Sequence, residues 1–256
     1  MATNNYGGDD DLIFNTASRI PVCLCVDTSA SMLKITSLEG AVDTGRVEFR
    51  DGRNWRIYEG GHTILGDLVN AINAFYDAIR NNEQAKLSCE IAIVTFNDVV
   101  NCKDEFATID RKENLDASDF DCDGDTSMGA GVEKALDLLE QRKNEYKANG
   151  VDYFQPWIVI LTDGVPTDDT SNAVNRCLDL EAAGKLTVFP IALNDEVDME
   201  VLSTFSAKRK PIKIKEGKLD SFFEWLGKSV SIVSSSQVGE KIKLDTSTMD
   251  DWADLE

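Results

Sequence analysis

Three groups of oxygen-bearing side chains stand at the edges of apolar segments in this sequence. Asp27, Ser29 and Ser31 alternate in "CVDTSAS", where a buried-looking run ends abruptly in a carboxylate. Asp163 follows a second apolar run in "TDG", and Thr126 lies in the loop "CDGDTSMGAG". All five side chains are carboxylates or hydroxyls, and such hard oxygen ligands suit Mg²⁺, Mn²⁺ or Ca²⁺ rather than zinc. The residue types therefore predict a divalent-cation site.

The charge of this donor set also predicts how the ion behaves. Few carboxylates beside neutral hydroxyls leave a dication incompletely neutralised, so the ion keeps a net positive charge and an open position. A carboxylate of a partner protein can then complete the coordination. Asp123 and Asp125 share the loop of Thr126. They either support the ligands from behind or form a solvated acidic loop, which is the simpler interpretation.

Other functions compete with a metal-dependent binding module. Asp27 and the two serines also fit a helix cap and a turn. A metal-dependent phosphatase or hydrolase is a second hypothesis, but "VDTSAS" lacks the second aspartate of a haloacid dehalogenase-type phosphatase. There is no glycine-rich phosphate loop followed by Lys-Ser/Thr, and the single histidine, His62, has no positioned nucleophile. We assign no catalytic residue, and a passive structural subunit stays as a third hypothesis.

The elements that position these residues follow from the apolar pattern. Four short, continuous runs rich in Val, Ile or Phe predict strands covered on both faces: 20–26, 87–96, 156–161 and 186–193. Amphipathic patterns predict helices between and after them: 63–80, 128–147, 171–184 and 220–235. Alternating strands and helices predict an α/β fold, with a central, mostly parallel sheet and helices on both faces. The carboxyl ends of such strands are where ligands bind.

One segment interrupts the alternation. Residues 41–59 carry alternating apolar residues on both sides of an Asp-Gly pair, which predicts an inserted β-hairpin. The hairpin holds four arginines that either face solvent or dock a partner: Arg46, Arg50, Arg53 and Arg56. The polar tail 236–256 is either disordered or a strap held by Ile242, Leu244 and Trp252.

Composition narrows the class of protein. The 256 residues carry 46 Asp and Glu against 26 Lys and Arg, a net charge of −20, which disfavours nucleic acids and anionic membranes as partners. The N-terminus lacks the pattern of a signal peptide and no window is apolar enough for a membrane span, so we expect a cytoplasmic protein. The six cysteines are expected to be reduced. Cys23 and Cys25 share one strand face but lack a second ligand pair, so we expect buried apolar side chains rather than a zinc site.

The order of the motifs resembles a known family. Asp27-x-Ser29-x-Ser31, then Thr126, then Asp163 in "TDG" resemble the metal-ion-dependent adhesion site (MIDAS) of von Willebrand factor type A (VWA) domains. The resemblance spans about residues 18–235, with an N-terminal extension at 1–17, and implies a Rossmann-like fold. It further implies that Ser29, Ser31 and Thr126 ligate the ion directly, whereas the two aspartates act mainly through water. Mg²⁺ is the expected ion, with Mn²⁺ or Ca²⁺ as alternatives, and a partner carboxylate is the expected ligand.

Finer features resemble a bacterial subgroup. "RIPVCLCVDTSASM", "DTSMGAGVEKAL" and "WIVILTDGVPTDD" look like TerY-like VWA proteins, which are associated with tellurite resistance and stress operons. Two features depart from the family. The hairpin is absent from the minimal domain, and "DGDTSMG" is less glycine-rich than the expected loop. The position of Asp125 beside Thr126 therefore bears on the affinity for the metal.

Overall fold

The sheet at the centre of the molecule has seven strands. The computed structural model describes residues 12, 14–50 and 53–255. The strands follow the spatial order β11-β10-β9-β8-β1-β6-β7, and all neighbours are parallel except the two outermost pairs, β6–β7 and β10–β11. Their bounds are β1 Ile20–Asp27, β6 Cys89–Phe96, β7 Val100–Thr108, β8 Trp157–Thr162, β9 Thr187–Ala192, β10 Ile212–Ile214 and β11 Ala253–Leu255. The expected mostly parallel α/β architecture is confirmed.

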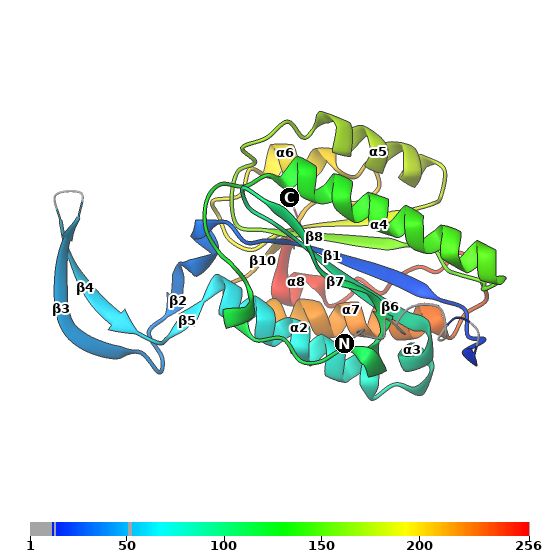
Figure 1. The fold of residues 1–256 in the computed structure, drawn as a ribbon, viewed down its shortest axis with the longest axis horizontal. Helices are drawn as coiled ribbons and strands as arrows, with labels where there is room; N and C mark the ends of the chain where they lie inside the picture. The colour runs from blue at the N-terminus through cyan, green and yellow to red at the C-terminus, as the bar shows by residue number, and fades with distance from the viewer. Residues whose placement is uncertain (1–11, 13, 51–52, 256) are drawn as a thin grey trace, which may run out of the picture.

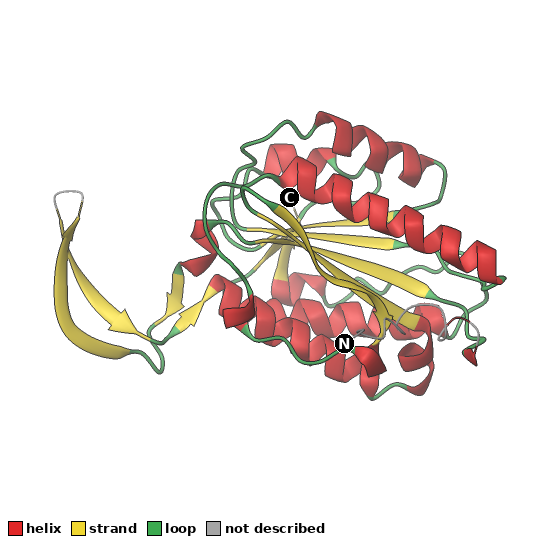
Figure 2. Cartoon of the chain, viewed as in Figure 1, coloured by secondary structure: helices red, strands yellow, loops and turns green. Residues whose placement is uncertain are grey.

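Helices cover both faces of this sheet (Figures 1 and 2). One face carries α2 (Ile64–Arg80), α3 (Glu83–Ser88), α7 (Leu219–Ser234) and α8 (Met249–Trp252). The other carries α4 (Met128–Asn149), α5 (Ser171–Ala182) and α6 (Met199–Thr204). Two apolar cores result, one on each side, and the central strand β1 divides its residues between them: Leu24 faces one core and Cys25 the other. Burial on both faces explains the continuous apolar runs of the central strands.

The helix ends follow local chemistry. The Thr63 side chain accepts a hydrogen bond from the backbone N–H of Gly66 at 3.0 Å and begins α2. Gly150 follows α4 with φ +67° and Gly184 follows α5 with φ +68°. In this left-handed region a side chain is disfavoured, so glycine ends both helices cleanly.

The inserted hairpin extends away from the sheet and its helices (Figure 1). It consists of β3 (Val42–Arg50) and β4 (Arg53–Glu59), paired antiparallel, with Arg50 opposite Arg53. The Asp-Gly pair at 51–52 lies outside the described residues. A second short ribbon at its base joins β2 (Ile35–Ser37) to β5 (His62–Thr63).

The C-terminal tail packs against the body. Trp252 is buried, Ile242 and Leu244 lie against the same core, and the indole N–H of Trp225 donates to the Asp245 carbonyl at 2.5 Å. Strand β11 then extends the sheet beside β10. Of the two interpretations of this tail, the packed strap is therefore right, and a disordered tail is wrong for the residues described.

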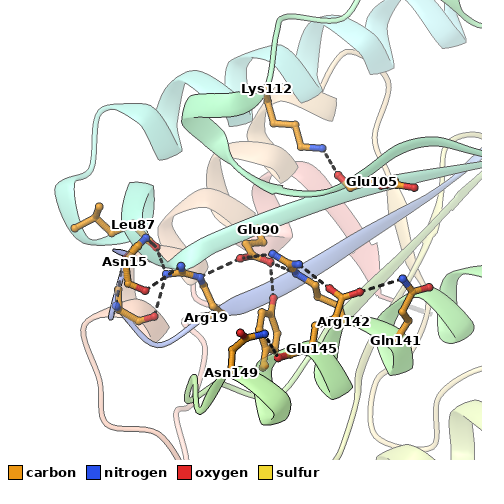
Figure 3. A network of polar contacts seen from close by, with 12 residues as sticks. Asn15, Arg19, Leu87, Glu90, Glu105, Lys112, Gln141, Arg142, Glu145 and Asn149 are labelled. Carbon is orange, nitrogen blue, oxygen red and sulfur yellow. Dashed lines mark hydrogen bonds and ion pairs between the residues drawn. The ribbon is translucent and has the colours of Figure 1, made fainter. Parts of the chain in front are cut away.

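A buried ionic network lies near the start of strand β6, at the amino end of the parallel strands (Figure 3). Glu90 is fully buried and binds Arg19 at 3.0 Å, Arg142 at 2.7 Å and the Tyr146 hydroxyl at 2.5 Å. Arg19 also donates to backbone carbonyls of Asn15, Ala17 and Leu87. The network therefore joins the segment before β1, strand β6 and helix α4.

Candidate metal site

Asp27 is the last residue of β1 and is fully buried. Its Oδ2 accepts a hydrogen bond from the Thr162 hydroxyl at 2.6 Å, and its Oδ1 accepts one from the backbone N–H of Ser29 at 2.8 Å. Burial raises the pKa of Asp27, and these hydrogen bonds act in the opposite direction. The carboxylate is thus fixed at the strand end by the next turn and by the neighbouring strand.

The two serines connect this turn to Asp163. A short 3₁₀ turn, Ala30–Leu33, follows Ser29, and its curvature places the Ser29 and Ser31 hydroxyl oxygens 3.0 Å apart. The Ser31 hydroxyl donates to Asp163 Oδ1 at 2.7 Å. β1 and β8 are parallel neighbours, so residues that follow them meet at one edge of the sheet.

Asp163 has one oxygen without a partner. Its Oδ2 is buried and accepts no hydrogen bond from the residues described. Burial, followed by the nearby charge of Asp27, raises the pKa of Asp163 to about 6, although the Ser31 hydrogen bond acts against this. A buried carboxylate oxygen without a donor is costly, and a coordinated cation or its water satisfies it.

Thr126 lies in the loop before α4, close to Gly164. Its backbone N–H donates to the Thr167 hydroxyl at 3.2 Å, and its carbonyl accepts from the Thr167 N–H at 2.9 Å. A β-carbon built on Gly164 would lie 3.5 Å from the Thr126 hydroxyl oxygen and 3.8 Å from that of Ser31. Both hydroxyls therefore border Gly164, and the structure brings Thr126 to the same glycine as Ser31.

The two loop aspartates do not join this group. Asp123 and Asp125 are exposed, and neither carboxylate hydrogen-bonds to the five side chains. The Asp123 carboxylate accepts from the next backbone N–H, of Gly124, at 2.8 Å. The solvated-loop interpretation describes both aspartates better than support of the ligands from behind.

Two aspartates that hold the loops were not predicted from the sequence. Asp98 accepts from the backbone N–H of Asp125 at 2.9 Å and lies so close to Gly124 that a side chain there would clash at 2.2 Å. Asp168 accepts from the N–H groups of Gly129 and Ala130 at the start of α4, at 3.0 and 2.8 Å. The "TDD" at 167–169 precedes α5, so the sequence would assign Asp168 to the start of that helix and gives no signal for its contact with α4.

The donor set fits a hard cation and not zinc bound by cysteine. Among the described residues, no three His, Cys, Asp or Glu side chains cluster as a metal site. The group has two carboxylates, so an ion here depends on the three hydroxyls as well. Burial raises the pKa of Cys23 and Cys25 well above the usual thiol range, so both stay protonated apolar side chains, as expected.

The arginine patch is partly neutralised in the structure. Arg56 forms an ion pair with Asp43 at 3.3 Å across the hairpin, and Arg46 is exposed. The side chains of Arg50 and Arg53 lie outside the described part of the chain. His62 binds Asp67 at 2.8 Å, and this contact raises its pKa. His62 therefore has a surface structural role.

A model of the von Willebrand factor type A domain matches residues 61–221. The chain belongs to the von Willebrand factor type A domain family. The matched residues include Thr126 and Asp163 and begin after the hairpin, so β1 with its Asp-x-Ser-x-Ser turn lies outside them. VWA domains are generally interaction modules rather than enzymes.

Solved VWA-like structures share this fold at low sequence identity. A VWA protein from Catenulispora acidiphila has 13% identity and a TM-score of 0.53, covering 84% of this chain and 43% of its own. The PilB minor pilin from Streptococcus sanguinis has 13% identity and a TM-score of 0.57, covering 86% and 64%. Proximal thread matrix protein 1 from the mussel byssus, with a zinc-occupied MIDAS motif, has 16% identity and a TM-score of 0.50, covering 86% and 47%.

These likenesses establish the fold alone. The chain spans less than two thirds of the length of each of these three structures. No curated protein sequence matches this chain. Within the described residues, no helix combines the length and apolar character needed to cross a membrane.

Proposed function

We propose that this VWA domain is a metal-ion-dependent protein-interaction module. Asp27, Ser29, Ser31, Thr126 and Asp163 would hold one divalent cation, with Mg²⁺ as the physiological ion. The observation that carries the proposal is the buried Oδ2 of Asp163, which has no donor among the described residues, on a carboxylate whose Oδ1 is bound by Ser31. A cation bound there removes that electrostatic cost.

The protein groups divide into two kinds. The hydroxyls of Ser29, Ser31 and Thr126 are neutral donors that would ligate the ion directly. Asp27 and Asp163 supply negative charge, and the hydrogen bonds from Thr162 and Ser31 orient their carboxylates. When bound, the ion supplies a positively charged centre with an open position, which takes an acidic side chain of a partner protein.

The choice of ion rests on the donor atoms. Oxygen-only sites favour Mg²⁺, Mn²⁺ or Ca²⁺. The mussel protein has a zinc-occupied MIDAS motif, so the ion bound here is to be tested by competition that includes zinc. We further propose that the protein is cytoplasmic and works in a TerY-like stress or tellurite-resistance system, on the strength of the motif resemblance given above.

The proposal is tested by capture of partners from the native host. Immobilised wild-type protein should retain a partner in Mg²⁺ and release it in EDTA, and Thr126→Val should retain none in either buffer. Equal capture in Mg²⁺ and EDTA would contradict the proposal. Metal-dependent turnover of p-nitrophenyl phosphate that Asp163→Asn abolishes would favour a hydrolase instead.

A further inference from the structure

A cleft of about 790 Å³ opens between the base of the hairpin and the edge of the sheet. One wall is formed by β2, residue Glu39 and β5, which belong to the insertion. The other is formed by the loop after β9, by β10 and by the start of α7. The insertion therefore creates a concave surface that a domain lacking it would not have, and its volume matches a ligand or several side chains of a peptide.

The described charges around this cleft are mostly negative. Six carboxylates line it, against two lysines and His62. Both lysines already bind lining aspartates: Lys213 lies 3.1 Å from Asp195, and Lys215 lies 3.7 Å from Asp254. The cleft therefore retains negative charge after its internal ion pairs are formed.

Among the side chains that the structure describes, three of the lining carboxylates have no cationic partner. Glu39, Glu216 and Asp220 are exposed and form no ion pair with any residue whose side chain is described. They come from the hairpin base, from the turn after β10 and from the first turn of α7. Carboxylates from three separate elements therefore face one opening.

The cleft is also partly apolar. Ile64 and Ile214 are nearly buried in its lining, whereas Ile35 of β2 is 51% exposed. An exposed isoleucine beside unpaired carboxylates is complementary to a long basic side chain, because the methylene stem covers apolar surface while the charged group reaches the carboxylates.

The hairpin-base wall of the cleft adjoins the candidate metal site along the chain. Lys34 follows the turn that holds Ser31 and directly precedes β2, and Glu196 follows Asp195 on the opposite wall. The Lys34 ammonium forms an ion pair with Glu196. This ion pair joins the two walls of the cleft on the side where the strands end and Asp163 follows β8.

We propose that this cleft binds a basic polypeptide segment, taking arginine or lysine side chains between Ile35 and the carboxylates of Glu39, Glu216 and Asp220. The cleft's affinity for such a segment is independent of metal. That the segment belongs to the same partner whose carboxylate reaches the cation rests on the function proposed above. Such a partner would present basic and acidic residues side by side.

The test uses a blocked peptide of alternating arginine and leucine, titrated into the full chain in EDTA. The cleft variant is Glu39→Gln/Glu216→Gln/Asp220→Asn. Its matched control, Glu83→Gln/Glu113→Gln/Asp179→Asn, removes the same charge from exposed carboxylates that do not line the cleft. We expect the cleft variant to bind the peptide about tenfold more weakly and the control less than about threefold more weakly. An equal loss in both variants would show binding to the overall negative charge and would overturn the proposal.

Isoleucine methyl NMR locates the peptide directly. The resonances of Ile35, Ile64 and Ile214 should shift on titration, whereas those of Ile93 and Ile158 in the central strands should not. Shifts confined to residues away from the cleft would overturn the proposal. Spermidine is the second probe: if it displaces the peptide and binds at least as tightly, the site takes small free cations and not a polypeptide segment.

The cleft proposal and the metal-site proposal can be contradicted independently of each other. Peptide binding is measured in EDTA, and Mn²⁺ binding to the cleft variant is measured by calorimetry without peptide. Loss of peptide binding with normal Mn²⁺ affinity is the result expected for this variant. If the wild type binds the peptide but no Mn²⁺, the cleft proposal stands and the metal proposal fails.

Discussion

Ser31 and Asp163 lie 132 positions apart in the chain, and the Ser31 hydroxyl donates to the Asp163 carboxylate at 2.7 Å. The contact exists because β1 and β8 are parallel neighbours whose following turns meet at one edge. It uses one carboxylate oxygen of Asp163, and the other is buried with no donor in the described part of the chain. This pair is the structural basis of the proposed metal site.

Replacing Asp163 by asparagine should weaken Mn²⁺ binding by at least tenfold, because the site loses one of its two negative charges. Asp125→Asn, an exposed neighbour of Thr126, removes the same charge and should change the affinity by less than about threefold. Isothermal titration calorimetry of both variants measures the difference. Equal losses would mean that the loop, and not the strand ends, binds the ion.

Asp27→Ala should affect the fold as well as the metal. The substitution leaves the Thr162 hydroxyl and the Ser29 N–H, both in a buried setting, without their acceptor. A lost buried hydrogen bond of this kind costs about 1–3 kcal/mol in the free energy of unfolding. Urea unfolding in EDTA measures the cost, and an unchanged midpoint would contradict it.

Metal affinity should fall below about pH 6. The pKa of Asp163 is raised to about 6, so the proton competes with the cation below that value, by about tenfold in affinity for each unit of pH. The metal-free fold has the opposite dependence. Between the unfolded pKa near 3.8 and about 6, the folded state binds this proton and the unfolded state does not, so this group favours folding as the pH falls through 6. Calorimetry across this range tests the first effect, and a constant affinity from pH 5 to about 7 would contradict it.

Glu90→Gln should destabilise the protein without changing metal binding. Removal of this fully buried charge takes a buried carboxylate partner from both Arg19 and Arg142, at a cost of about 3–5 kcal/mol. Glu145→Gln, which breaks only the partly exposed contact with Arg142, should cost less than about 1 kcal/mol. Urea unfolding compares the two. Because Glu90 lies at the start of β6 and the site lies beyond the strand ends, the Mn²⁺ affinity of the folded variant should stay unchanged.

The apolar pattern predicted the central strands because both faces of each strand are buried. It predicted the main helices because each helix buries one clear apolar stripe. It missed β7, whose alternating, half-exposed pattern contains charged residues typical of an antiparallel edge strand. It also missed β10 and β11, since three residues give no periodicity. The five candidate site residues could be proposed from the sequence because each follows or precedes a strong apolar pattern.

Other features depend on contacts distant in the chain. The single Glu90 in an apolar run signals a buried charge, but its partners Arg19 and Arg142 come from segments 71 and 52 residues away. The cleft forms only when the hairpin base meets the end of β10. Neither arrangement has a local sequence pattern, so only the structure reveals them.

Anomalous scattering from crystals grown with Mn²⁺ tests the central claim most directly. We predict one manganese peak at the carboxyl end of β1, with the hydroxyl oxygens of Ser29, Ser31 and Thr126 within about 2.3 Å and a position open to solvent or to a carboxylate. The peak should vanish in Asp163→Asn. Absence of a peak in the wild type, or a peak bound by Asp123 and Asp125 instead, would contradict the account.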